Sequence, residues 1–437
     1  MLKYLGILIV GILTSIYYFP IFTTLLPSGL NTKMVIALLG LVIGAWKTLQ
    51  AKSANIDKTF FVLTIYAIIV SLVCCFSIVY NGTVDTAYAS YFISMLVWLS
   101  GAYALCNVIK VVHGQSSIVL LTNYLTAVCV CQCILALVID NVPSVQNLVD
   151  TYVINDQEYL GKIGRLYGVG ASLDTAGMRF SLVLVMLTSL LLTIQDTIYK
   201  KYLWLYITSY VVIVVVGNMM ARTTTVGFVI SLFYIIFEAK AYRFKIKANV
   251  RILWKWLTVV VLVALPYIIY KYNTDVGFYK NIRFAFEGFF ALLETGEWEV
   301  GSNSQLSRMI VFPDNLKTWI IGDGYFNNPV NVDPYYVGEV TSGYYKNTDI
   351  GYLRFIFYMG LTGLITFSIF MCKAAQMAIE RFKEYRMMIL LLLLVHFIVW
   401  LKVSSDCFVI FALLLCIPKE DNDEYNKLVA LNNENSL

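Results

Sequence analysis

The hydrophobic residues of this chain are collected in long blocks, and mostly short polar connections separate one block from the next. A helix needs about 20 apolar residues to cross a bilayer, whereas the strands of a membrane barrel alternate apolar and polar positions. The pattern therefore predicts an all-α, polytopic membrane protein of about twelve transmembrane helices. The final two blocks are short enough to form one re-entrant hairpin instead. The predicted spans lie near 4–26, 33–50, 59–79, 88–109, 117–140, 177–194, 202–219, 224–238, 252–272, 351–372, 387–402 and 404–417.

The composition indicates the same fold class. Of the 437 residues, 59% are hydrophobic and only 14% are charged, against about 25% charged in typical soluble domains. A soluble protein of this size could not bury so much apolar surface, so that class is excluded. No small-residue cleavage site followed by a polar domain ends the first block, so we expect a first span rather than a signal peptide.

The positions of lysine and arginine predict how the chain is oriented. Short connections that are rich in these residues stay in the cytoplasm, and the segment 239–255 is the densest basic cluster in the chain. Both termini are therefore expected in the cytoplasm, and the net charge of +5 indicates topology rather than nucleic-acid binding. We expect a single transmembrane domain over 1–418 and a disordered polar tail over 419–437.

Two connections on the opposite, outer side are much longer than the others. They cover 141–176 and 273–350, and long loops of this kind usually carry function. In the second loop the pattern predicts a helix from Gly301 to Ile321, interrupted near Pro313. A turn is expected directly afterwards, at Gly322-Asp-Gly324.

Charged residues are nearly absent from the middle of the predicted spans, where His396 is the clearest exception. A proton or ion pathway would need polar groups through the midplane, so the chemistry is expected at the outer face. Arg222 lies among hydroxyl residues in a tight outer connection, which suits a bidentate phosphate clamp. Snorkelling at a helix end is the equally weighted alternative. The charges at the outer ends are Arg165, Arg179, Arg222, Arg308, Arg354, Lys402, Asp349 and Asp406.

The outer loops contain neither cysteine nor histidine. All nine cysteines lie in or beside apolar blocks, and His113 is expected on the cytoplasmic side. A zinc site or a histidine-activated nucleophile in the outer loops is therefore excluded. Tyrosines of the second loop could stack on sugar rings or simply pack within the loop; they are Tyr335, Tyr336, Tyr344 and Tyr345. Asn81-Gly-Thr83 is a glycosylation triplet of a kind expected by chance.

In its topology and motifs the chain resembles the bacterial O-antigen polymerase and ligase superfamily, of the Wzy type. The likeness covers most of the chain and includes the arginine-rich outer connection Ala-Arg222-Thr-Thr-Thr-Val-Gly227. It also includes the large outer loop, with Ser-Arg308 and Trp319-Ile-Ile-Gly322-Asp-Gly324, which ends in Asp349-Ile-Gly351-Tyr-Leu-Arg354. The ligase branch typically has a histidine near Asn347-Thr-Asp349, and its absence here favours a polymerase.

The resemblance implies glycosyl transfer at the outer, periplasmic face of the bacterial inner membrane. The donor would be a glycan on undecaprenyl diphosphate, and the acceptor the terminal sugar of another lipid-linked repeat, without a metal or a cofactor. Asp349 would act as the base and Arg222 would stabilise the leaving diphosphate. A chain-length regulator and a flippase of the same pathway would be its partners. Residues expected to bind the diphosphate or the glycan are Arg165, Arg179, Arg308, Arg354 and Tyr345.

Two alternatives remain open from the sequence. An O-antigen ligase would use the same donor with a different acceptor. A flippase or transporter of lipid-linked oligosaccharides would share the number of spans and the anionic cargo. Such a transporter should, however, carry charges through the midplane and lack so long an outer loop.

Overall fold

The computed structural model describes residues 2–50, 58–154, 165–193, 202–238, 248–338 and 343–434. Each apolar block of the sequence contains a helix. Among these described residues, seven helices are long and apolar enough to cross a membrane, so the protein is an all-α polytopic membrane protein. The helices of the apolar blocks are α1 (Leu2–Tyr18), α2 (Thr32–Gln50), α3 (Lys58–Asn81), α4 (Tyr91–His113), α5 (Ile118–Asn141), α8 (Leu173–Thr193), α10 (Leu203–Met220), α11 (Thr224–Glu238), α12 (Ala248–Thr274), α18 (Gly351–Arg381), α19 (Arg386–Val399) and α20 (Phe408–Cys416).

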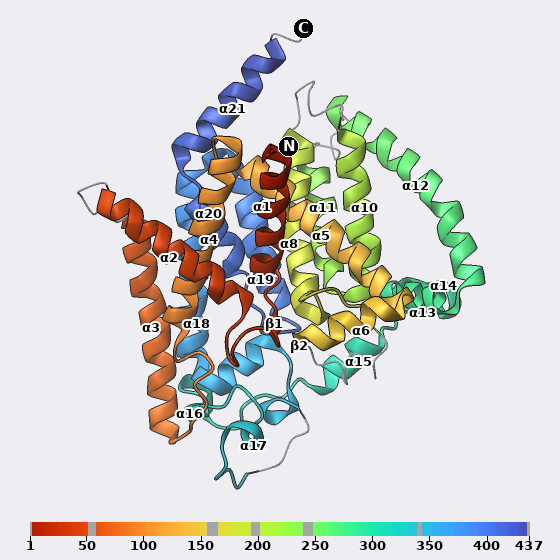
Figure 1. The fold of residues 1–437 in the computed structure, drawn as a ribbon. Coiled ribbons are helices and arrows are strands. Elements are labelled where there is room, and N and C mark those ends of the chain that lie inside the picture. The colour runs from red at the N-terminus through yellow and green to blue at the C-terminus, as the bar shows by residue number, and fades with distance from the viewer. Residues whose placement is uncertain are drawn as a thin grey trace.

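Helix α8 lies at the centre of the bundle (Figure 1). In the 18-residue apolar window of Leu173–Leu192, 89% of the residues are buried, and the helix packs against α5, α10, α11 and α19. A helix that is apolar on every side belongs in such an interior position. At the periphery, α2, α3 and α12 expose leucine, valine and phenylalanine side chains, as helices facing lipid do.

Helices α19 and α20 are too short to cross a bilayer. They contain 14 and 9 residues, which at about 1.5 Å per residue gives roughly 21 and 14 Å, against about 30 Å of hydrocarbon. In the connection between them, 400–407, Trp400 is completely buried and contacts Phe355 and His396. This connection nevertheless lies level with the outer ends of the long helices, because the carbonyl oxygen of Trp400 accepts a hydrogen bond from the N–H of Tyr352 at the start of α18 (3.2 Å) and Lys402 pairs with Asp174 at the start of α8 (2.7 Å).

The long connections fold into short helices at the end of the bundle opposite α21 (Lys419–Glu434) (Figure 1). The predicted helix from Gly301 to Ile321 is divided in two, because 309–315 leaves the helix and the Asn315 side chain caps the second part. The connections contain α6 (Pro143–Tyr152), α13 (Val276–Ala285), α14 (Glu287–Thr295), α15 (Gly301–Arg308), α16 (Leu316–Ile320), α17 (Pro329–Val332), the 3-10 helix η2 (Tyr345–Asn347), and an antiparallel pair of two-residue strands, β1 (Phe22–Thr23) and β2 (Val153–Ile154).

Two boundaries differ from the sequence predictions. Helix α8 begins at Leu173, so the first long connection ends before the predicted residue 176 and includes fewer residues. The polar tail, predicted to be disordered, forms α21 over 419–434. Buried Asn422 accepts a hydrogen bond from the backbone N–H of Ile118 at the start of α5 (3.1 Å), and Asp421 pairs with Lys110 (2.7 Å). These two contacts anchor the tail to the bundle. A further 3-10 turn, η3 (Lys383–Tyr385), joins α18 to α19.

Candidate active-site cleft

A polar cleft of about 1050 Å³ opens at the loop end of the bundle. Its wall combines segments that are distant in sequence: the start of α8, the end of α15, the residues before α18 and the α19–α20 connection. That connection contributes Val403, Ser404 and Ser405 to the lining. Five residues singled out from the sequence line it: Arg165, Arg308, Tyr344, Asp349 and Arg354.

Asp349 is a partly buried carboxylate beside a guanidinium. Its Oδ1 lies 3.8 Å from Nη1 of Arg354, and its side chain is 36% exposed. Burial, reinforced by the nearby charge of Asp174, raises the pKa of Asp349 to about 6, while Arg354 and Lys402 oppose that increase. Ile350, and not Asp349, is the N-cap of α18. Asp349 is therefore a carboxylate in the cleft rather than a helix cap.

Arg354 is held by protein groups on every side. It donates from Nη1 to Oγ of Ser404 (2.7 Å) and from Nη2 to the carbonyl oxygen of Phe326 (3.1 Å). Its guanidinium lies between two rings, 3.8 Å from the centre of Phe326 and 3.4 Å from that of Tyr344. Only 6% of the side chain is exposed. Because its guanidinium is already bonded and buried, Arg354 is better suited to hold Asp349 in place than to bind an incoming diphosphate.

A second carboxylate, Asp174, is paired within the same cleft. Its Oδ1 accepts hydrogen bonds from Nζ of Lys402 (2.7 Å) and from the hydroxyl of Thr223. These bonds join the start of α8 to the α19–α20 connection and to the turn between α10 and α11. From sequence, Asp174 and Lys402 stand out only as charges near helix ends, because nothing local indicates that they meet.

Arg222 lies behind the cleft wall and is already paired. Its guanidinium forms an ion pair with Glu287, the first residue of α14, and stacks 4.0 Å from the centre of the Phe284 ring. Arg165, which does line the cleft, stacks on the same ring at 4.7 Å. Glu287 also accepts a hydrogen bond from the backbone N–H of Gly301, at the start of α15 (3.2 Å). Sequence reasoning missed Glu287, because 65 residues separate it from Arg222.

Arg179 and Tyr345, both predicted to bind substrate, do not line the cleft. Arg179 is 6% exposed and lies within α8, with its guanidinium 5.5 Å from the ring centre of Phe19. Tyr345 donates to Oδ2 of Asp323 (3.2 Å) and lines a separate cavity of about 280 Å³. Its neighbour Tyr344 occupies the position beside Arg354 instead. We leave Arg179 and Tyr345 out of the site.

Comparison with known proteins provides no relative for this chain. No protein-family model matches it, and no curated protein or solved structure is significantly similar. The function proposed below rests on the geometry of the cleft and on the sequence patterns that it brings together.

Proposed function

We propose that the protein is a glycosyltransferase that polymerises lipid-linked oligosaccharide repeats on the outer face of the bacterial inner membrane. It transfers a growing glycan from undecaprenyl diphosphate to the terminal sugar of another lipid-linked repeat. The observation that carries this proposal is the cleft itself, in which arginines and a carboxylate with a raised pKa meet at the end of a bundle of apolar helices.

The chemistry needs two kinds of group, and the cleft offers both. The acceptor hydroxyl attacks the anomeric carbon of the donor sugar, and the bond from that carbon to the diphosphate oxygen breaks. The hydroxyl proton passes to the carboxylate of Asp349, acting as general base. The diphosphate leaves with both electrons of the broken bond, and Arg165 and Arg308 stabilise its negative charge from the cleft wall.

Arg222 contributes to this reaction only when the diphosphate displaces Glu287 from it. Glu287 pairs with its guanidinium, and both Arg222 and the cleft residue Arg165 contact Phe284. A diphosphate that reaches the back of the cleft can replace the Glu287 carboxylate, because a guanidinium can bind phosphate through two parallel hydrogen bonds. Arg222 then adds a third positive charge to the leaving group.

The location of the cleft supports a substrate that is carried by a lipid. Because residues at the starts of α8 and α18 line the cleft, a diphosphate bound there lies beside the outer ends of apolar helices, where the lipid chain of such a substrate can remain among them. The volume of about 1050 Å³ is at the upper end of the range of small-molecule sites, roughly 300–1000 Å³. That space accommodates several sugar rings.

Chain length provides the decisive experiment. The purified protein in lipid nanodiscs is incubated with undecaprenyl-diphosphate-linked repeats from its host, and the products are separated by size on a gel. We expect a ladder of lipid-linked chains from the wild type and only single repeats from Asp349→Asn. The matched control is Asp333→Asn, since Asp333 accepts a hydrogen bond from Tyr325 in the same loop and does not line the cleft.

Deletion of the gene in its host separates the alternatives. A polymerase deletion leaves single repeats exported and, where a ligase exists, attached to their final carrier. Long chains stranded on undecaprenyl diphosphate would identify a ligase instead. Single repeats trapped on the cytoplasmic side would identify a flippase. Either of the last two outcomes overturns the proposal.

A further inference from the structure

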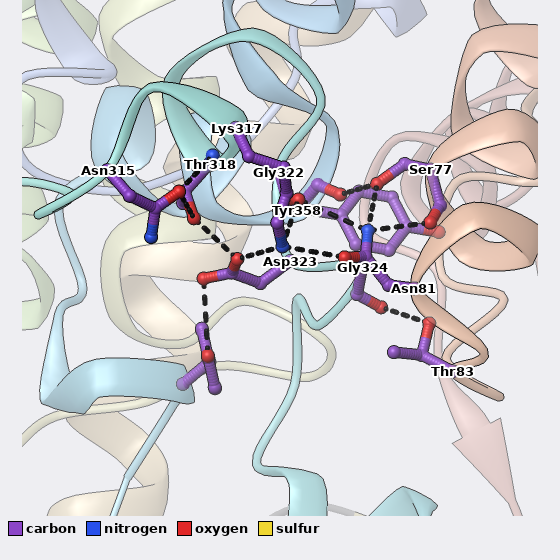
Figure 2. Close-up of polar contacts among 11 residues, drawn as sticks. Ser77, Asn81, Thr83, Asn315, Lys317, Thr318, Gly322, Asp323, Gly324 and Tyr358 are labelled. Carbon is purple, nitrogen blue, oxygen red and sulfur yellow. Dashed lines mark hydrogen bonds and ion pairs between the residues drawn. The ribbon is translucent and has the colours of Figure 1, made fainter.

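The corner between α3 and α4, residues 77–85, holds one edge of the second long connection. Figure 2 shows that Asn81 donates from its side-chain amide to the carbonyl oxygen of Gly322 (3.1 Å), and that Thr83 donates to that of Gly324 (3.0 Å). Lys317 links the two segments, because its Nζ donates to Oδ1 of Asn81 (2.7 Å) and to Oδ1 of Asp323 (2.8 Å). The turn after α16 is therefore fastened to the corner by side chains.

Backbone groups next to a break in α18 bind the same turn from the other side. Gly360 adopts φ 69° and interrupts the helix, so carbonyl groups just before it are available to partners outside α18. The backbone N–H groups of Asp323 and Gly324 bond to the carbonyl oxygens of Phe357 and Tyr358. The turn is thus fixed between two helices, and the residues that follow it have a defined position.

Asp85, at the end of the corner, holds those following residues. It is 2% exposed, and its carboxylate accepts hydrogen bonds from the backbone N–H groups of Phe326 (2.9 Å), Asn327 (2.7 Å) and Ala87 (3.1 Å). The side-chain amide of Asn327 donates a further bond to it (3.2 Å). A buried carboxylate is tolerated when donors surround it in this way. Loss of its charge would weaken all four bonds.

Phe326 connects Asp85 to the proposed catalytic pair. Its N–H donates to Asp85, its carbonyl oxygen accepts from Arg354 (3.1 Å), and its ring lies 3.8 Å from the Arg354 guanidinium. Arg354 is in turn 3.8 Å from Asp349. A continuous series of contacts therefore runs from the α3–α4 corner to the carboxylate in the cleft.

We propose that Asp85 is a positioning residue for the glycosyl transfer, which sets the place of Arg354 through Phe326 and thereby the basicity of Asp349. This inference rests on the proposed function. Asp85 does not line the cleft and needs no contact with substrate. Its influence is expected in turnover and in the dependence of turnover on pH, with little change in the affinity for the lipid-linked substrate.

The test is the pH profile of turnover in Asp85→Asn. When Arg354 moves from Asp349, the carboxylate loses a positive neighbour, so the acid limb of the profile should shift to higher pH. A rise of about one unit in the pKa of Asp349 would lower its ionised fraction at pH 7 from about nine tenths to about one half, so turnover there should decrease about twofold. The other charged groups that face Asp349 or line its cleft remain unchanged, namely Asp174, Lys402, Arg165 and Arg308. Asp333→Asn serves as the control and should keep the wild-type profile.

A second variant covers the case in which Asp85→Asn does not fold. Phe326→Leu leaves Asp85 and the backbone carbonyl in place but removes the ring from the Arg354 guanidinium, and should shift the acid limb in the same direction. A lower turnover with an unmoved acid limb in either folded variant would overturn the inference, because a merely structural role lowers the amount of active protein at every pH. Wild-type protein that makes no polymer would instead overturn the proposed function.

Discussion

The carboxylate of Asp349 should give the polymerising reaction an acid limb centred near pH 6. Burial in the cleft raises the pKa of this group from its ordinary 3.8 to about 6. A general base works only in its ionised form, so activity should be lost as the pH falls through that value. Lowering the pH is therefore the perturbation, and the resulting loss of turnover can be calculated from the ionised fraction of Asp349.

With a pKa of about 6, about nine tenths of the Asp349 side chains are ionised at pH 7 and about one tenth at pH 5. Turnover should therefore decrease roughly ninefold to tenfold over these two units. An aspartate with the ordinary pKa of 3.8 would remain more than about nine tenths ionised at pH 5 and would produce almost no decrease. The two cases are easily distinguished.

The assay is the initial rate of chain extension in nanodiscs with saturating lipid-linked repeats, measured from pH 5 to pH 8. Asp349→Asn should lower the rate by about 10²- to 10⁴-fold and abolish the acid limb while substrate still binds. The variant should be no less stable than the wild type at pH 7, because a raised pKa means that the ionised carboxylate is disfavoured in the folded state. A flat rate between pH 7 and pH 5, or a variant within twofold of wild type, would refute the reasoning.

Four further predictions concern the remaining features of the structure. Arg222→Ala should abolish chain extension and Arg222→Lys should restore little of it, because a point charge replaces a planar fork; full activity of the lysine variant would leave only a general positive charge. Glu287→Gln should bind undecaprenyl diphosphate more tightly in a vesicle-binding assay, since the competing carboxylate is lost; unchanged affinity would show that Glu287 does not occupy the phosphate position. Gly360→Ala should lower the thermal stability in detergent by about 2 kcal/mol or more, since a Cβ there would lie 2.1 Å from the Ile320 carbonyl oxygen; an unchanged melting temperature contradicts this. Deletion of 420–437 should also lower the melting temperature, because the bond from the Ile118 N–H to Asn422 and the pair of Lys110 with Asp421 are lost.

The sequence by itself determined where the helices are, because hydrophobic length is a local property. Every apolar block contains a helix, since a backbone in hydrocarbon must satisfy its hydrogen bonds within its own segment. The same physics predicted that charged groups would lie at the ends of the spans, as a charge in the bilayer is costly. Arg165, Arg308, Asp349 and Arg354 are such end groups, and the fold brings them to one cleft.

The sequence did not predict which side chains of a helix face the cleft and which face the interior of the bundle. Arg179 and Arg354 both follow the start of an apolar helix, yet Arg179 is in the interior of the bundle and Arg354 is at the cleft. Because α8 begins at Leu173, Arg179 belongs to its second turn and faces Phe19 rather than the cleft. Successive residues of a helix differ in direction by a fixed angle, so the face on which Arg179 lies depends on how α8 is rotated within the bundle.

Only the tertiary structure decided which distant residues are partners. Asn81-Gly-Thr83 matches a glycosylation triplet in sequence, but in the fold its side chains hold the turn at 322–324. Asp85 bonds to Phe326, which is 241 residues away, and Glu287 neutralises Arg222 across 65 residues. Such pairs leave no local pattern, because the packing of helices and loops brings them together. The cleft residues are therefore partly readable from the chain, while the groups that position and neutralise them appear only in three dimensions.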